Sequence, residues 1–300
     1  LALKAPLNAV FMYGWLGFPA MGGGGAGVSF FVLSWLSLFA FLVIWKFDKF
    51  YRPMHVEKIA GPRWELLKNH LHVGVPMGLS TFFEVSSFTL MAIFISRLGE
   101  ETVSAHQIVA NLTSMLYMVP LSLGIASSVL ISQSLGARWP AVAEFILRRT
   151  LKISIVIAAV LATLLYLFKG NIIALYTSDA GVAATAAALV AFGCTYHVFD
   201  ATQAVSSFAL RGYRVTRAPM FIYGIMLWGV GIGFGYQLAF GAEWAGGPYG
   251  AFGFWGATAV GLILTGLSLL AMALWVGRQR SRDEHHSPEE VERVIREARA

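Results

Sequence analysis

Residues 151–168 of the chain read LKISIVIAAVLATLLYLF, and Lys152 is their only charged side chain. A helix that crosses the ~30 Å hydrocarbon layer of a bilayer needs about 20 predominantly apolar residues. Blocks of this kind recur along the sequence, and none has the ~10-residue alternation of a membrane β-barrel. We expect a partial span near 1–13 and full spans near 26–45, 71–97, 105–133, 151–168, 182–208, 218–240 and 251–276. The predicted fold class is an all-α integral membrane protein, a polytopic helical bundle.

The composition argues against other classes of protein. The 300 residues are 57% hydrophobic and 13% charged, with a mean hydropathy of +0.67, whereas soluble domains carry about 25% charged residues. These values exclude a disordered chain and make a soluble globule a poor interpretation. The single cysteine, Cys194, lies inside an apolar block, so the chain cannot form an internal disulfide.

The basic residues are distributed unevenly over the loops between the blocks. Most of the 22 lysines and arginines fall in alternate loops and in the C-terminal tail, while the opposite loops hold only Lys169. Because cytoplasmic loops carry the excess of Lys and Arg, the first set is predicted to be cytoplasmic. The net charge of +6 follows from this topology and does not indicate a nucleic-acid partner. We expect a multi-pass protein of the plasma membrane, which in a bacterium is the inner membrane.

Two acidic residues lie deep in the predicted spans. Glu84 falls near the middle of the third block and Asp200 deep in the sixth. A carboxylate at mid-bilayer costs at least ~2.5–3.5 kcal/mol. No Lys or Arg lies at comparable depth, so we expect each acid to carry a proton or to be neutralised by a bound cation. A pair that changes between these states suits an ion-coupled carrier, although a protonated acid can also make a purely structural hydrogen bond.

Polar, aromatic and Met side chains follow the same helical faces as the two acids, since residues three or four apart share a face. The block between the acids carries a third such stripe. Ordinary helix packing explains the small residues in these stripes but not the acids. We expect the stripes to line one partly wet cavity whose soft surfaces suit organic cations. The predicted cavity residues are Thr81, Ser87, Phe88, Met91, Gln107, Asn111, Met118, His197 and Gln203.

The sequence lacks the patterns typical of enzymes and of resident metal sites. It contains no HExxH or CxxC pattern, no nucleophile elbow and no Walker motif. We therefore predict no enzymatic activity, no catalytic residue and no cofactor. The one metal site that the sequence suggests is for a monovalent cation at Glu84 and Asp200.

Several ordered motifs resemble those of the multidrug and toxic compound extrusion (MATE) transporters, and the likeness is strongest to the NorM-like branch. It runs from the end of that family's fifth helix to its twelfth and covers nearly the whole chain. The motifs are Pro6-Leu7-Asn8, Phe82-Phe83-Glu84-Val85, Ala105-His106-Gln107-Ile108 with Asn111, and Tyr196-His197-Val198-Phe199-Asp200 followed by Ala209-Leu210-Arg211-Gly212-Tyr213.

This resemblance implies a transporter of twelve helices in two six-helix lobes, which exchanges organic cations and drugs for Na⁺ or H⁺. In NorM-like members the C-lobe cation site uses a Glu, an Asp and a nearby Tyr, which match Glu84, Asp200 and Tyr196 here. The full-length protein would act as a monomer in the bilayer, and the earlier helices of the N-lobe would precede this chain. The implied divisions are 1–47 as the last two helices of the N-lobe, the first one partial, 48–70 as a cytoplasmic inter-lobe loop, 71–276 as the six-helix C-lobe and 277–300 as a cytoplasmic tail.

The sequence departs from the family pattern after Tyr213, where Arg214-Val215-Thr216 replaces the usual Lys-Asp-Thr run. We expect this change to affect the loop more than ion coupling. A flippase for lipid-linked sugars or a polysaccharide exporter of the same superfamily is an alternative, but such proteins more often have basic cavities. An intramembrane aspartyl protease also uses two acids, but it typically has Gly-x-Gly-Asp, whereas Asp200 follows Tyr196-His197-Val198-Phe199. The sequence does not decide between Na⁺ and H⁺.

Overall fold

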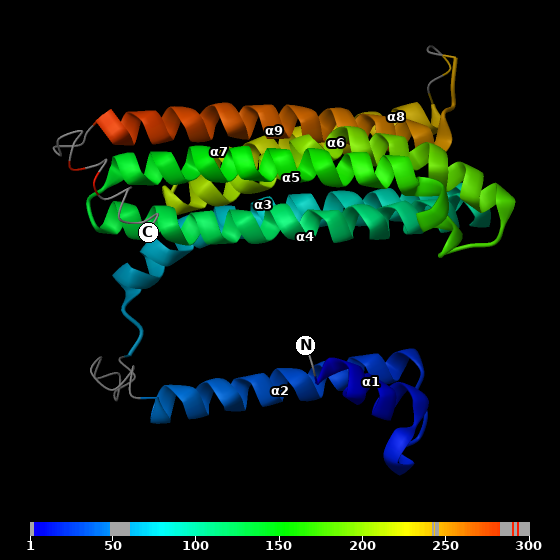
Figure 1. Cartoon of the computed structure of the whole chain (residues 1–300), viewed down its shortest axis with the longest axis horizontal. Coiled ribbons are helices and arrows are strands. Elements are labelled where there is room, and N and C mark those ends of the chain that lie inside the picture. Colours follow the sequence, from blue (N-terminus) through cyan, green and yellow to red (C-terminus); the bar gives the residue numbers. More distant parts are fainter. Residues whose placement is uncertain are drawn as a thin grey trace. The chain divides into compact units, whose positions relative to one another are not determined.

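The computed structural model describes residues 3–48, 61–241, 243, 246–282, 290 and 293. Every regular element within these ranges is a helix (Figure 1). The chain divides into two compact units, Leu1–Trp64 and Glu65–Ala300. Both are helical, as the apolar blocks predict.

The first unit is a helical hairpin. Helix α1 (Lys4–Tyr13) leads through a short 3-10 helix, η1 (Trp15–Gly17), to the longer α2 (Gly23–Phe47), which packs against α1. A Cβ added at Gly25 would overlap the backbone of Phe11. The two helices therefore approach at a distance that only glycine allows, as is common for helices in membranes.

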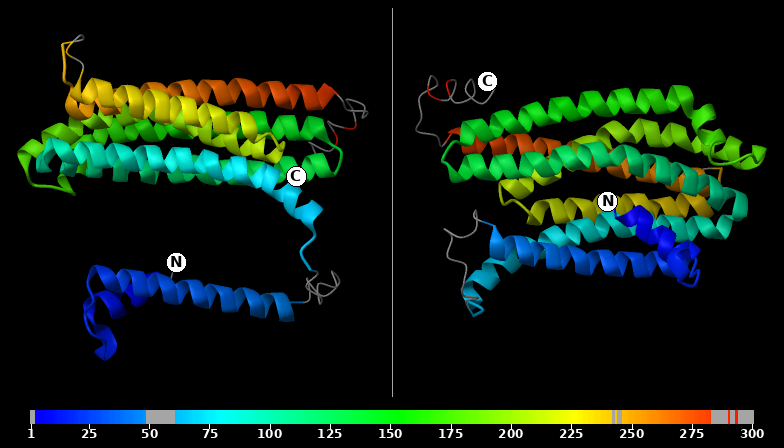
Figure 2. Two further views of the ribbon diagram at one scale, coloured as in Figure 1. Left: turned by 180° about the vertical axis from the view of Figure 1, so that it is seen from behind. Right: turned by 60° about the horizontal axis from the view of Figure 1, so that its bottom comes forward.

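The second unit is a bundle of long helices that lie roughly along one axis (Figures 1 and 2). One of its spanning segments, residues 217–240, consists of three short helices that follow one another without a break. The elements are α3 (Trp64–Ile95) with η3 (Ser96–Leu98), α4 (Glu100–Gly136), α5 (Pro140–Ala174), α6 (Ala180–Gly212), α7 (Arg217–Tyr223) with η4 (Gly224–Phe234) and α8 (Gly235–Phe240), and α9 (Gly250–Arg282).

Helix α6 runs through the interior of this bundle. It packs against α4, α5 and α9, and residues 200–207 are buried without interruption. The buried Trp255 of α9 stacks on Tyr196 of this helix. Asp200 consequently lies in the protein interior and not against lipid.

Seven helical segments of the described residues are long and apolar enough to cross a membrane. They match the seven predicted full spans, and α1 occupies the predicted partial span. Pro76 and Pro120 lie inside α3 and α4, which remain helical on both sides of them. The predicted fold class, a polytopic all-α membrane protein, is confirmed.

Two predicted boundaries differ from the structure. Helix α3 begins at Trp64, so residues 64–70 are helical and not part of a loop, since WELLKNH contains no helix breaker. Helix α9 continues to Arg282, past the predicted end at residue 276, because its polar last turns remain helical beyond the apolar block. Residues 49–60 of the predicted loop and all of 283–300 except Glu290 and Arg293 lie outside the described residues.

The span predicted at 218–240 is helical but not uniform, because η4 is a π-helix between two short α-helices. Such segments are rare and often mark functional sites. Glycines bring this segment close to α9: a Cβ added at Gly261 would lie 2.7 Å from the carbonyl oxygen of Met226. One at Gly235 would lie 3.0 Å from Phe254, whereas one at Gly229 would meet open space. Gly235 therefore lies at a close helix contact, and Gly229 does not.

Candidate ion and substrate site

Glu84 joins three helices through its carboxylate. The hydroxyl of Tyr117 on α4 donates a hydrogen bond to Glu84 Oε1 on α3 at 2.9 Å. The side-chain amide of Gln203 on α6 donates to the same oxygen at 3.1 Å. Both donors are neutral, so they orient the carboxylate without neutralising its charge.

Asp200 lies about one turn from Gln203 on α6 and is only 7% exposed. The carboxyl groups of Asp200 and Glu84 lie within electrostatic range of each other, and the phenols of Tyr117 and Tyr223 lie within range of both. The structure therefore brings together the two acids that the sequence singled out. Like charges at such proximity favour a proton or a cation on the pair.

Tyr196 is buried one turn before Asp200, and its ring stacks on Trp255 of α9 with a centroid distance of 6.1 Å. The Trp255 ring also meets the imidazole of His106 edge-on, with a centroid distance of 5.7 Å. Tyr196 and Asp200 lie within electrostatic range of each other. The predicted trio of Glu84, Asp200 and Tyr196 thus lies around the same part of α6.

One basic residue of α6 reaches toward Glu84 from the end of its helix. Arg211, in the last turn of α6, lies within electrostatic range of Glu84. Its guanidinium donates to Thr81 Oγ1 at 3.3 Å and lies over the ring of Phe208, 4.4 Å from the centroid. The long Arg211 side chain extends back along α6 over Phe208. Counting the charged residues in the loops does not reveal how far this side chain reaches.

Several buried polar atoms along α6 have no hydrogen-bond partner among the described residues. They are both ring nitrogens of His197, Oε1 of Gln203 and the hydroxyl of Ser206. An unpaired buried polar group costs about 1–3 kcal/mol. All of them lie on α6 within two turns of Asp200.

The other predicted cavity residues separate into different environments. Met91 is buried in the core, where its sulfur accepts a hydrogen bond from Thr258 at 3.5 Å, and Phe88 packs against that core. The Ser87 hydroxyl is bonded to the backbone carbonyl of Glu84. Met118 is 53% exposed. Met91 and Ser87 are buried, and Phe88 is half-buried against the core.

The polar stripe of α4 lines a hollow of its own. This hollow has a volume of about 440 Å³ and is lined by Gln107, Ile108, Ala110, Asn111, Ser114 and Tyr176. The Tyr176 hydroxyl donates to Asn111 Oδ1 at 3.0 Å. Neither acid is among the residues that line this hollow.

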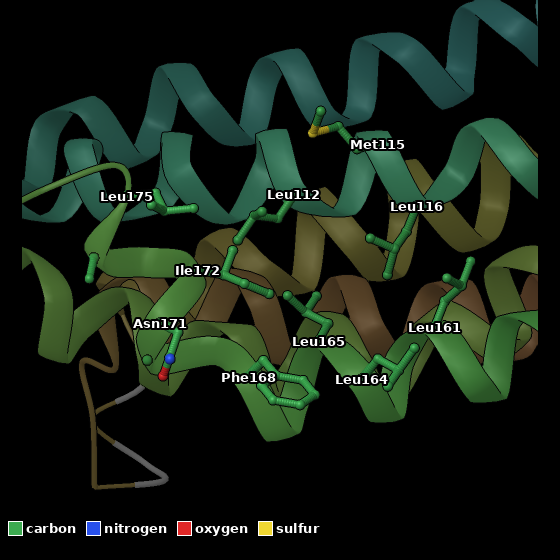
Figure 3. Close-up of a pocket in the computed structure, with 12 residues that line it drawn as sticks. Leu112, Met115, Leu116, Leu161, Leu164, Leu165, Phe168, Asn171, Ile172 and Leu175 are labelled. Atoms are coloured by element: carbon green, nitrogen blue, oxygen red, sulfur yellow. The ribbon is translucent and has the colours of Figure 1, made fainter.

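A larger and mainly apolar groove lies beside this hollow, between α4 and α5 (Figure 3). Its volume is about 990 Å³. We call it the α4–α5 groove; it is lined by Leu112, Met115, Leu116, Leu161, Leu164, Leu165, Phe168, Gly170, Asn171, Ile172, Ala174 and Leu175. No prediction from the sequence anticipated it.

Sequence reasoning missed several members of the acidic cluster. Tyr117 lies three residues after Ser114 on the α4 stripe, but the stripe was continued through Met118, four residues on. Tyr223 sits at the end of a short helix whose neighbours the sequence does not reveal. Trp228 of η4 donates to Ser86 Oγ at 3.0 Å, which ties η4 to the helix that carries Glu84.

The long apolar helices and the two acids within them define a multi-pass α-helical membrane protein with an acidic cluster. The MatE family model matches residues 76–237. The chain therefore belongs to the MatE family, as its motifs predicted, and its bacterial relatives indicate the inner membrane.

Curated relatives support this assignment. The "Probable multidrug resistance protein NorM" of Aromatoleum aromaticum is 39% identical over 260 residues, covering 86% of this chain and 56% of the relative. The protein of the same name from Neisseria meningitidis serogroup B is 35% identical over 269 residues, covering 89% of this chain and 58% of the relative. The chain thus spans somewhat more than half the length of these relatives.

The fold is also that of solved transporters. The eukaryotic MATE transporter AtDTX14 superposes with a TM-score of 0.80 at 20% identity, over 94% of this chain and 62% of that one. An outward-facing multidrug resistance MATE family transporter of the MOP superfamily gives a TM-score of 0.73 at 20% identity, over 94% of this chain and 60% of that one. These comparisons confirm the predicted architecture, part of a two-lobe helical transporter.

Proposed function

We propose that this chain forms the C-terminal part of a secondary transporter that exports organic cations and drugs in exchange for Na⁺ or H⁺. The observation that carries this proposal is the proximity of half-buried Glu84 and buried Asp200, since Gln203, one turn along α6 from Asp200, donates to Glu84 Oε1 at 3.1 Å. Two acids in a membrane interior are costly and are typically functional. The printed names of the bacterial relatives, multidrug resistance proteins, agree with it.

The acidic pair supplies the exchange step in this proposal. With both acids deprotonated, the cluster is negative and attracts an organic cation. A proton or Na⁺ that arrives from outside neutralises the pair, weakens that attraction and favours release of the substrate. The organic cation and the coupling ion compete in this way only if both bind at the same negatively charged site.

Neighbouring side chains prepare Glu84 and Asp200 for this exchange. The hydrogen bonds from Tyr117 and Gln203 hold Glu84 Oε1, which leaves Oε2 for the ion. The unpartnered Oε1 of Gln203 offers a further oxygen near Asp200, of the type that Na⁺ prefers. Arg211 offsets part of the charge on Glu84 from the cytoplasmic end of α6.

The substrate surface in this proposal combines the acidic cluster with the exposed polar face of α4. Gln107 and Asn111 provide hydrogen-bonding groups in the polar hollow, and the exposed Met118 provides an adaptable apolar contact on the same helix. The single Arg211 does not outweigh two acids. This balance favours a cationic substrate over the anionic lipid-linked sugar of a flippase.

The test uses the full-length transporter that carries this sequence, reconstituted in vesicles. A Na⁺ gradient and a pH gradient are imposed separately, and uptake of ethidium is followed by fluorescence. We expect one gradient to drive uptake and the added coupling ion to inhibit ethidium binding competitively. Uptake that is independent of both gradients would overturn the proposal.

A further inference from the structure

A row of polar side chains on α4 leads to the acidic cluster. Gln107, Asn111 and Ser114 follow one another at spacings of four and three residues, so they share one side of the helix, and all three are exposed. Tyr117, three residues further on, donates its hydrogen bond to Glu84 Oε1 at 2.9 Å. We call these four positions, Gln107, Asn111, Ser114 and Tyr117, the α4 polar face.

The α4 polar face occupies the outer half of its helix. The distribution of basic residues places Glu100, where α4 begins, at the outer side of the membrane. Tyr117 lies near the middle of the 37 residues of α4. The helix rises about 15 Å between Gln107 and Tyr117, which is half of the hydrocarbon layer. An exposed amide at this depth is costly against lipid, so we expect the face to meet water.

Tyr176, two residues after the end of α5, lies against the centre of this face. Its hydroxyl donates to Asn111 Oδ1 at 3.0 Å and lies 4.0 Å from the sulfur of Met115. Tyr176 also lines the polar hollow of about 440 Å³, together with Gln107, Asn111 and Ser114. Because a water molecule takes about 30 Å³ in the liquid, the hollow has room for several of them beside the Tyr176 ring.

The charge of the face suits the passage of an ion and not its retention. Residues 107–117 contain no charged side chain, and the face offers amide and hydroxyl oxygens. An ion moves along a path whose groups bind it well enough to enter but weakly enough to leave. Neutral oxygens meet this condition for a hydrated cation or for a proton carried by water. The face ends at Glu84, the acid bonded to Tyr117.

We propose that the α4 polar face is the path by which the coupling ion reaches Glu84 from the outer side, and that the hydrogen bond between Tyr176 and Asn111 narrows this path. The proposal rests on the proposed function for the role of the ion, whereas access of water to the face does not depend on it. An incoming ion and a departing organic cation would meet on this one face.

The first test measures access of water in the full-length transporter, with Cys194 and any cysteine outside this chain replaced by Ser. Ser114→Cys is labelled in right-side-out vesicles with the membrane-impermeant, positively charged thiol reagent MTSET. Thr163→Cys is the matched control, since Thr163 is also an exposed hydroxyl residue in the outer half of its helix, α5, but does not line the hollow. We expect labelling of Ser114→Cys and not of Thr163→Cys. Adding Tyr176→Phe should speed the labelling about fivefold, which corresponds to ~1 kcal/mol.

The second test asks whether the face carries the ion. Ser114→Leu places an apolar side chain on the path without touching Glu84 or Asp200, and Thr163→Leu is its control. We expect Ser114→Leu to raise the concentration of the coupling ion that gives half-maximal ethidium uptake, and Thr163→Leu to leave it unchanged.

Equal labelling of Ser114→Cys and Thr163→Cys would overturn the proposal, and so would an unchanged ion dependence in Ser114→Leu. Either result, with ion-driven uptake intact in the unmodified transporter, would leave the proposed function standing. Uptake by the unmodified transporter that ignores both ion gradients would instead overturn the proposed function, and the role of the path with it.

Discussion

The hydrogen bond from Tyr117 to Glu84 offers a direct test of the acidic cluster. Tyr117→Phe removes one hydroxyl, keeps the ring and leaves the other donor to Glu84 Oε1, from Gln203, in place. The change therefore perturbs the carboxylate without leaving that oxygen bare. We expect it to weaken the link between α3 and α4.

The expected size of this effect follows from the geometry. Hydrogen bonds to charged groups contribute about 1.5–3 kcal/mol, but bonds between helices in membranes average about 0.6 and reach about 1.7 kcal/mol. The O···O distance of 2.9 Å is slightly longer than the usual ~2.7–2.8 Å for hydroxyl donors. We therefore expect a coupling free energy of about 1 kcal/mol, a factor of about five in an equilibrium constant.

The assay is a double-mutant cycle of Tyr117→Phe and Glu84→Leu, with the free energy of unfolding measured by reversible denaturant titration in detergent micelles. Tyr176→Phe serves as the control, because the Tyr176 hydroxyl bonds Asn111 and not an acid. A Tyr117–Glu84 coupling within the ~0.3–0.5 kcal/mol scatter of independent sites would refute the reasoning. So would a coupling no larger than that of the control cycle.

Two further predictions concern the bundle. Gly261→Ala should lower the free energy of unfolding by about 1–3 kcal/mol, because its Cβ would press on the carbonyl oxygen of Met226. Gly256→Ala on the same helix should be neutral or stabilising, since its Cβ would meet only an ordinary contact at 3.7 Å; equal effects in the same titration would contradict this account. Asp179→Ala should cost about 1 kcal/mol by removing the side-chain bond to the Val182 amide that begins α6, and Asp179→Asn should retain most of it. Indistinguishable unfolding of these two variants would show that the cap contributes nothing.

The spanning helices were predictable because the bilayer sets their length. The block at 151–168 could be assigned from hydropathy alone, and it lies within α5. Hydropathy contains no information on helix type, however, so the π-helical register of η4 was not predictable. That segment packs closely against Gly261 at Met226, and these two residues are far apart in sequence. The start of α3 at Trp64 was missed because its polar first turns continue the helix beyond the apolar block.

The two acids of the site could be predicted because a charged side chain is costly in the membrane. The side chains that contact them could be predicted only in part. Gln203 follows from its spacing to Asp200, and it does bond Glu84. From the sequence alone, either Tyr117 or Met118 could continue the polar face of α4, and helical periodicity does not distinguish between them. Met91 shares a face with Glu84 in sequence, but α9 covers it through Thr258. Arg211 lies beyond the predicted span 182–208, but α6 continues to Gly212 and the Arg211 side chain reaches Thr81.

The central claim is that Glu84 and Asp200 couple substrate movement to an ion. Its most direct test is gradient-driven ethidium uptake in vesicles by the full-length transporter carrying Glu84→Gln or Asp200→Asn. Asp179→Asn, which changes an acid outside the cluster, is the control. The account predicts that both cluster variants lose the dependence of uptake on the ion gradient while the control keeps it. Undiminished gradient-driven uptake in both cluster variants would contradict it.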